Sequence, residues 1–108
     1  MSVTINICED QLMSNTFKIA HIREQNVDLI LIPLEDNFRY KVEDEQIRTK
    51  NALQHYAAAA GLAGTVIPVW NDGGGRMAFI APRAWHNFLC SIGMAFVHAN
   101  LNRELRCG

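Results

Sequence analysis

The order of apolar and polar residues predicts two elements in the first part of the chain. Residues 3–8 alternate Val, Ile and Ile with Thr, Asn and Cys, a period of two that is typical of a half-buried strand. Asp10 or Ser14 can cap a following helix, because their side-chain oxygens accept hydrogen bonds from its first free N–H groups. One apolar helical face then consists of Leu12, Met13, Phe17 and Ala20. We expect this helix to end near Asn26.

The next two elements carry stronger signals. Val27–Leu34 is the most continuous apolar run, which predicts an interior strand buried on both faces. A second helix is predicted over roughly residues 43–60, because its acidic first turn suits the positive end of the helix dipole. Its inward-facing residues are expected to be Leu53, Tyr56, Ala57 and Ala60. Gly61 supplies the C-terminal stop.

A glycine-rich turn joins two further apolar runs. Thr65–Trp70 and Arg76–Ala81 flank the sequence Asn-Asp-Gly-Gly-Gly at 71–75, which predicts a β-hairpin. Pro68 lacks a backbone donor, so we expect one side of the first strand to have no partner. Residues 82–92 are predicted to form a short helix, because a proline fits its first turn.

Residues 97–107 fit two templates. Apolar and polar residues alternate except at Arg103, which predicts a strand. A helical face of Met94, Val97, Leu101 and Leu105 also fits. Two asparagines weaken that helix, so the strand is the preferred interpretation. The chain is therefore expected to be a single α+β domain over residues 1–108, a mixed sheet of about five strands with two main helices and one short helix in a single pair of layers.

Composition narrows the class of protein. At 108 residues, the chain is long enough to bury a core without a metal or a disulfide. Hydrophobic residues make up 49% and charged residues 19%, which favours a chain that hides some surface in a homodimer or other homo-oligomer. The net charge of −1 leaves no strong basic surface for nucleic acid. We therefore expect a homo-oligomer that binds no nucleic acid.

The cysteines and the N-terminus indicate a compartment. Cys8, Cys90 and Cys107 are an odd set without the paired spacing of a disulfide framework or a zinc site. The first residues show no basic stretch followed by an apolar one, as a secretory leader would. No apolar run approaches the ~18 residues of a membrane span. We expect a cytoplasmic protein with reduced thiols and no contact with the membrane.

Residues around the glycine turn are the strongest candidates for a binding site. Successive backbone N–H groups in such a turn can form a nest for an anion, to which Arg76 adds a forked donor. Trp70 and Trp85 would supply apolar walls, and His86 a neutral donor or acceptor. Asp72 lies at the predicted hairpin tip near Arg76. These five residues form the predicted site for a small anionic or aromatic ligand, with no cofactor and no metal.

Each of these features also has a structural explanation. The glycines can simply form a permissive hairpin loop in which Asp72 caps its own turn. Trp70 and Trp85 can equally be anchors of the core or of a protein interface. The interface alternative would make the chain a protein–protein interaction module.

A small enzyme, such as a hydrolase or transferase, is a further alternative. His86 and Cys90 are four residues apart, so they share one face of the predicted helix. An imidazole beside a thiol can activate a nucleophile or form half of a metal site, and Asp72 can act as a base. The structural explanation is that a buried cysteine behaves as a small hydrophobe. Whether the chain is an enzyme stays open.

Roughly the last third of the chain resembles a known group. The residues that carry the resemblance are Gly75–Pro82, Trp85-His86, Phe88, Ser91-Ile92, Ala95–Val97 and Ala99–Arg103. This run is similar to one found in small uncharacterised proteins carried by bacterial mobile integron gene cassettes. The resemblance implies a free-standing bacterial cytoplasmic protein, of a kind that often self-associates and sometimes holds a small-molecule pocket. The group has no assigned activity, so the resemblance implies no catalytic residue.

Overall fold

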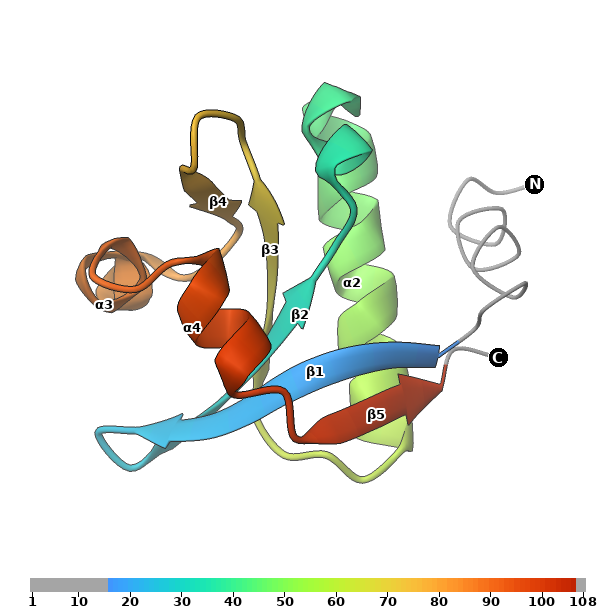
Figure 1. Cartoon of the computed structure of the whole chain (residues 1–108). Helices are drawn as coiled ribbons and strands as arrows, with labels where there is room; N and C mark the ends of the chain where they lie inside the picture. The colour runs from blue at the N-terminus through green and yellow to red at the C-terminus, as the bar shows by residue number, and fades with distance from the viewer. Residues whose placement is uncertain (1–15, 107–108) are drawn as a thin grey trace.

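The computed structural model describes residues 16–106, which form a five-stranded mixed sheet covered by helices (Figure 1). The strands are β1 (Thr16–Glu24), β2 (Val27–Pro33), β3 (Thr65–Asn71), β4 (Met77–Phe79) and β5 (Arg103–Arg106). The helices are α2 (Glu43–Ala59), α3 (His86–Cys90) and α4 (Met94–Ala99), with 3-10 turns η1 (Asp36–Tyr40) and η2 (Arg83–Trp85). The predicted α+β class is confirmed. The strand predicted at 3–8 lies outside the described residues.

The strands lie in the order β4-β3-β2-β1-β5. β2 and β3 are parallel and are joined by α2 as a crossover helix, whereas the other neighbouring strands are antiparallel. In the β1–β2 register, Ala20 lies opposite Leu31. The start of β1 therefore lies beside the carboxyl end of β2, at the centre of the sheet.

β1 replaces part of a predicted helix. Phe17 and Ala20 belong to this strand and pack on opposite faces of the sheet, so the helix predicted through these residues is wrong for the described part. Their spacing of three matches a helix only by coincidence. The chain then reverses at Gln25 and Asn26, whose φ angles of 51° and 66° fit a type I′ turn. Glutamine is unusual in such a turn, so the hairpin has no clear signal in the sequence.

The core occupies both faces of the sheet, and the central residues 29–32 of β2 are fully buried, as predicted. One cluster, under α2, contains Ile19, Ile30, Ile32, Leu53, Ala57, Val66 and Leu105. The other, under α3 and α4, contains Ala20, Leu29, Leu31, Ile67, Val69, Leu89 and Val97. The sheet thus has a helical layer on each face, one more than the single pair of layers expected.

α2 follows the prediction closely. It begins with three acidic residues and is followed by Gly61, whose φ of +80° allows the chain to leave the helix. Leu53 and Ala57 are buried, and Tyr56 packs half-buried against the same cluster. Ala60 is exposed, contrary to expectation, because it lies just beyond the last helical residue. No helix in the described part of the chain is long and apolar enough to cross a membrane.

β3 and β4 form the predicted hairpin, with Val69 opposite Phe79. The expectation that β3 lacks a partner on one side is wrong, since β2 and β4 flank it. Pro68 is tolerated because β4 ends at Phe79, so its missing N–H faces the point where strand pairing stops. The N–H of Ile80 still donates to the Pro68 carbonyl at 3.1 Å. The helix predicted over 82–92 is present as η2 followed by α3.

The C-terminal segment is first helical and then extended, so each of the two predicted patterns applies to one part of it. Val97 lies in α4, and within the described part of the predicted strand only residues 103–106 pair with β1. The Asn100 side chain donates to the Phe96 carbonyl at 2.8 Å and closes the helix. The Asn102 side chain accepts from the His21 N–H and donates to the His21 carbonyl, both at 2.9 Å. The two asparagines therefore end α4 and fasten the chain to β1.

Candidate functional site

A cleft of about 470 Å³ opens at the carboxyl end of β2; we call it the β2-end cleft. It is larger than three other cavities among residues 16–106, which measure about 420, 350 and 280 Å³. Its apolar walls are Phe17, Pro33, Leu34, Phe38 and Leu101. Its polar lining consists of Thr16, Lys18, Glu35, Asn37, Lys41, Thr49 and His98. Five separate segments of the chain therefore meet at one end of the sheet.

The topology explains why these segments meet. β1 starts where β2 ends, so Phe17 lies beside Leu34 against the same core cluster. η1 folds back over this end because Phe38 is buried there, only 4% exposed. The Gln46 side chain on α2 donates to the Phe38 carbonyl at 3.0 Å and holds the turn in place. Ligands of open α/β sheets commonly bind beyond the carboxyl ends of strands, which is where this cleft lies.

The polar groups of the β2-end cleft differ in burial. Thr49 is only 5% exposed, and its hydroxyl donates to the Glu45 carbonyl at 3.0 Å, which leaves the oxygen free to accept. Lys18 and Lys41 are exposed, and neither forms an ion pair with another described residue. The cleft thus combines an apolar interior with charged groups at its mouth.

The structure does not bring Trp70 and Trp85 together. Trp70 follows Val69 in β3 and therefore points to the α2 side, where its ring meets Phe38 edge-on at 4.8 Å between centroids. Trp85 packs on the other face, with its ring 6.5 Å from that of Phe88. The two indole rings belong to different packing layers and form no common pocket wall.

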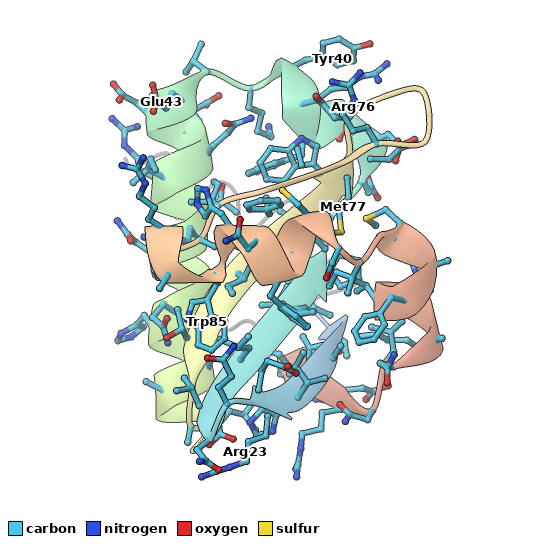
Figure 2. The ribbon with its side chains drawn as sticks, turned by 90° about the vertical axis from the view of Figure 1, so that its left-hand side faces the viewer. Arg23, Tyr40, Glu43, Arg76, Met77 and Trp85 are labelled. Carbon is cyan, nitrogen blue, oxygen red and sulfur yellow. The ribbon has the colours of Figure 1, made fainter. Side chains whose placement is uncertain are left out.

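Asp72 and Arg76 are exposed at the hairpin tip. Figure 2 shows Arg76 at this tip, far from Trp85. The Asp72 N–H donates to the Arg76 carbonyl at 2.8 Å, and the Gly73 N–H donates to the Asn71 side chain at 3.0 Å. The three glycines at 73–75 all have positive φ. These internal bonds and backbone angles account for the glycine run as a hairpin loop.

Trp70 and His86 do share a second cleft, of about 420 Å³, between the start of α2 and the segment that follows β4. We call it the β4-side cleft. The His86 ring lies edge-on to Phe79 at 5.1 Å, and its Nε2 is 3.0 Å from the Ala81 carbonyl oxygen. Two of the five predicted site residues therefore meet in space. Asp72, Arg76 and Trp85 are not among the residues that line this cleft.

Among residues 16–106, no hydrogen bond joins the His86 and Cys90 side chains on which the enzyme alternative draws. Cys90 is exposed, so the interpretation of this cysteine as a buried hydrophobe is wrong. His86 and Cys90 begin and end α3, but the His86 ring nitrogen bonds to Ala81 rather than to the thiol. Within residues 16–106, no group of three or more metal-ligating side chains comes together.

The chain matches no protein-family model, no curated protein and no solved structure. The resemblance of the last third of the chain to integron-cassette proteins therefore stays a prediction. Any functional inference has to come from the geometry of the two clefts.

The β2-end cleft has only faint signals in the sequence. Leu34 and Glu35 directly follow the apolar run of β2, which is the usual place for a ligand contact in such sheets. Phe38 lies in the largely polar stretch between β2 and α2, together with Tyr40 and Val42, and is a second hint. Phe17 and His98 cannot be assigned to this place from the sequence, because they reach it only through strand pairing and the position of α4.

Proposed function

We propose that this chain is a small-molecule-binding domain whose ligand occupies the β2-end cleft. The observation that carries the proposal is the cleft itself, a cavity of about 470 Å³ at the end of a central strand, lined by both apolar and polar side chains. Binding sites for small molecules are typically concave, mostly apolar and equipped with a small number of orienting polar groups. The proposed ligand site is therefore the β2-end cleft, which Phe38 lines, and not the hairpin tip at which the sequence predicted it.

The lining favours an aromatic or aliphatic ligand with an anionic group. Phe17 and Phe38 offer apolar and aromatic surface for the body of the ligand. Lys18 and Lys41 contribute two positive charges at the mouth, against one negative charge from Glu35. A carboxylate on the ligand would gain a charge-assisted contact from a lysine while its body stays in the apolar interior.

Thermal denaturation with a panel of small carboxylates, including phenylacetate and hexanoate, tests this proposal. A ligand present at 100 times its dissociation constant stabilises the folded state by about 2.7 kcal/mol. We expect Asn37→Trp to abolish this stabilisation, because Asn37 is exposed at the rim and a large ring there would cover the cleft. The control is Asn51→Trp on the outer side of α2, which should respond to ligand as the unaltered protein does.

The same panel separates charge from shape. Lys41→Met should weaken binding of phenylacetate about fivefold, the effect of one charge-assisted contact at a solvated site. Binding of the neutral analogue phenylacetamide should change little. The proposal is refuted if no member of the panel raises the melting temperature, or if Asn37→Trp leaves the stabilisation intact.

Self-association is a second candidate property, supported by an exposed apolar corner. Tyr40 and Val42 are 74% and 64% exposed, and Ile47 on the next turn of α2 is also exposed. Large side chains of this kind are more common at protein contacts than on free surfaces. Sedimentation of the unaltered protein and of Tyr40→Ser/Val42→Ser would test it: we expect a dimer that the double substitution converts to a monomer.

A further inference from the structure

The β4-side cleft has a feature that the proposed function does not use. Its walls come from the first turns of α2 and from residues 79–86, and Figure 2 shows Glu43 at the beginning of α2. Trp70 forms part of the wall, although its side chain is 95% buried by the residues around it. The Nε1–H of this ring is fully buried and has no hydrogen-bond acceptor, the only such side-chain atom within the described residues.

A buried donor without an acceptor is unusual in folded proteins. More than nine in ten buried polar groups have a hydrogen-bond partner. A group without one loses its hydrogen bonds to water, and no bond within the protein compensates for this loss. Trp70 is fixed in this place by its edge-on contact with Phe38 and by its position in β3. Because Nε1 is fully covered, an acceptor on a bound molecule would satisfy the donor only after the atoms that cover Nε1 shift to admit it.

The remaining polar groups of the β4-side cleft are acceptors. A carbonyl oxygen can only accept, so the 3.0 Å contact to Ala81 means that His86 Nε2 carries a hydrogen and the neutral ring has a free acceptor at Nδ1. Gln46 uses its amide nitrogen on the Phe38 carbonyl, which leaves its amide oxygen free. Glu43 has no ion-pair partner among residues 16–106. A ligand that matches these groups brings several donors and a positive charge, together with one acceptor for Trp70.

We propose that the β4-side cleft is a second binding site, for a small ligand with a primary ammonium group and a nearby carbonyl oxygen. The ammonium group lies toward Glu43 and the aromatic rings of Phe79 and Trp70, a combination that attracts organic cations. The carbonyl oxygen accepts from Trp70 Nε1 once the atoms that cover this N–H shift aside on binding. The positive end of the α2 dipole opposes a cation here, and the acidic side chains of Glu43, Asp44 and Glu45 offset it.

Three matched probes test each part of this ligand description. Leucinamide carries the ammonium group, the carbonyl and an apolar side chain. 4-Methylpentanamide lacks the ammonium group, and 3-methylbutylamine lacks the carbonyl. The chain has two tryptophans, so an amide-correlation NMR spectrum of the uniformly labelled protein contains two indole N–H signals, which Trp85→Phe assigns. We expect leucinamide to move the Trp70 signal downfield with saturation, while the Trp85 signal stays in place.

Two pairs of variants then measure the contributions. Trp70→Phe keeps a ring and removes the donor, so affinity for leucinamide should fall about fivefold, whereas Trp85→Phe should leave it unchanged. Glu43→Gln should lower it about threefold, and the control Asp44→Asn, one residue along and outside the cleft lining, should not. Each loss should disappear with the probe that lacks the corresponding group.

The proposal is overturned if the Trp70 indole signal does not move with leucinamide, or if the three probes bind equally well. It is also overturned if Trp70→Phe and Trp85→Phe have the same effect on affinity. Asn37→Trp, which covers the β2-end cleft, should leave leucinamide binding unchanged. The two sites are therefore tested independently, and one can fail without the other.

Discussion

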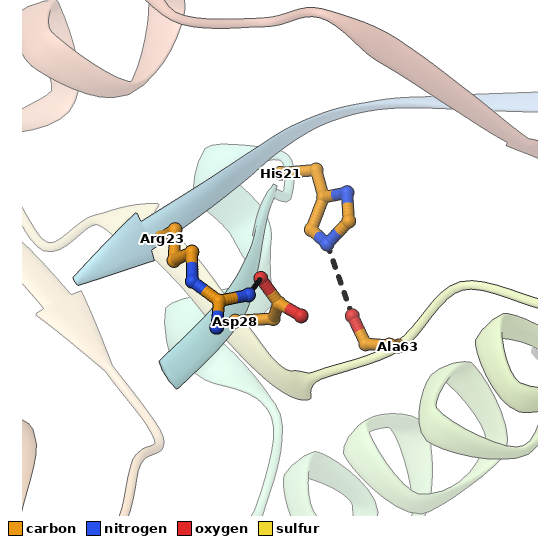
Figure 3. A network of polar contacts seen from close by, with 4 residues as sticks. All are labelled: His21, Arg23, Asp28 and Ala63. Atoms are coloured by element: carbon orange, nitrogen blue, oxygen red, sulfur yellow. Dashed lines mark hydrogen bonds and ion pairs between the residues drawn. The ribbon is translucent and has the colours of Figure 1, made fainter. Parts of the chain in front are cut away.

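At the end of the sheet that carries the β1–β2 turn, side-chain hydrogen bonds join neighbouring segments. At the opposite end, side-chain bonds from Gln46 and Asn71 reach η1, and the Phe38 and Trp70 rings pack together. We call these the closed end and the open end. At the closed end, Gln54 donates to the Gly64 carbonyl and accepts from the Val66 N–H. His21 lies 3.0 Å from the Ala63 carbonyl, and Arg23 pairs with Asp28 at 3.2 Å (Figure 3). At the open end, the Phe38–Trp70 contact separates the two clefts.

The two ends differ in how much space their interactions leave for a ligand. Directional bonds leave little room at the closed end, and the residues that make these bonds line neither the β2-end cleft nor the β4-side cleft. Apolar contacts at the open end bury Phe38 of η1 without filling the space beyond β2. A rigid scaffold with a less filled end is the usual basis of a binding site, because the scaffold positions the residues that contact the ligand.

The largest expected effect comes from Gly64→Ala at the closed end. A Cβ at this position would lie 2.7 Å from the Asp28 carbonyl oxygen, and the φ of +130° disfavours any side chain. We expect the free energy of unfolding to fall by about 3 kcal/mol, from overpacking and backbone strain together. Urea denaturation measures this loss directly.

The matched control is Gly61→Ala, where φ is +80° but no atom lies within 4 Å of the added Cβ. Only the backbone penalty remains, about 1 kcal/mol. Equal losses for the two variants would show that the close approach to Asp28 does not constrain the closed end.

Gln54→Ala should have the next largest effect. The substitution removes two hydrogen bonds and leaves the Gly64 carbonyl and the Val66 N–H without their partners. We expect a loss of about 2 kcal/mol in the free energy of unfolding. Asn51→Ala, an exposed amide on the same helix, should change it by less than about 0.5 kcal/mol. Binding in the two clefts should not change, because Gln54 lies at the opposite end of the sheet.

Phe38→Leu tests the open end, with a smaller effect on stability and a larger one on binding. It removes the edge-on aromatic contact with Trp70, worth about 1 kcal/mol. Because Phe38 lines the β2-end cleft and contacts a wall of the β4-side cleft, affinity for ligands of both should fall. Phe88→Leu is the control, since it also breaks an aromatic contact, with Trp85, but lines neither cleft. If both variants bind ligand equally well, Phe38 does not shape the clefts.

The same contrast explains which elements could be predicted from the sequence. β2, α2 and the β3–β4 hairpin are defined by local patterns: a continuous apolar run, an acidic first turn with a final glycine, and a glycine turn between apolar segments. β1 and β5 depend on distant partners. The bond between His21 and Asn102 joins residues 81 positions apart, and no local pattern indicates it.

The candidate site was harder to predict for the same physical reason. Trp70 and Trp85 are close in the sequence, but strand alternation places Trp70 on the α2 face and the turn after β4 carries Trp85 to the other. Phe17 and Phe38 lie far apart in the sequence and meet at one cleft through antiparallel pairing and a 3-10 turn whose Phe38 is buried. Distance along the sequence therefore does not indicate which residues meet at the open end.

The smallest expected effect comes from Arg23→Gln, which removes the ion pair with Asp28 at the closed end (Figure 3). The Arg23 side chain is 62% exposed, so water screens its attraction to Asp28. We expect a change of less than about 0.5 kcal/mol in the free energy of unfolding at physiological salt. The unaltered protein should lose the same small amount in 1 M sodium chloride relative to the variant. A loss near that of Gln54→Ala would mean that charge, rather than satisfied backbone groups, holds this end together.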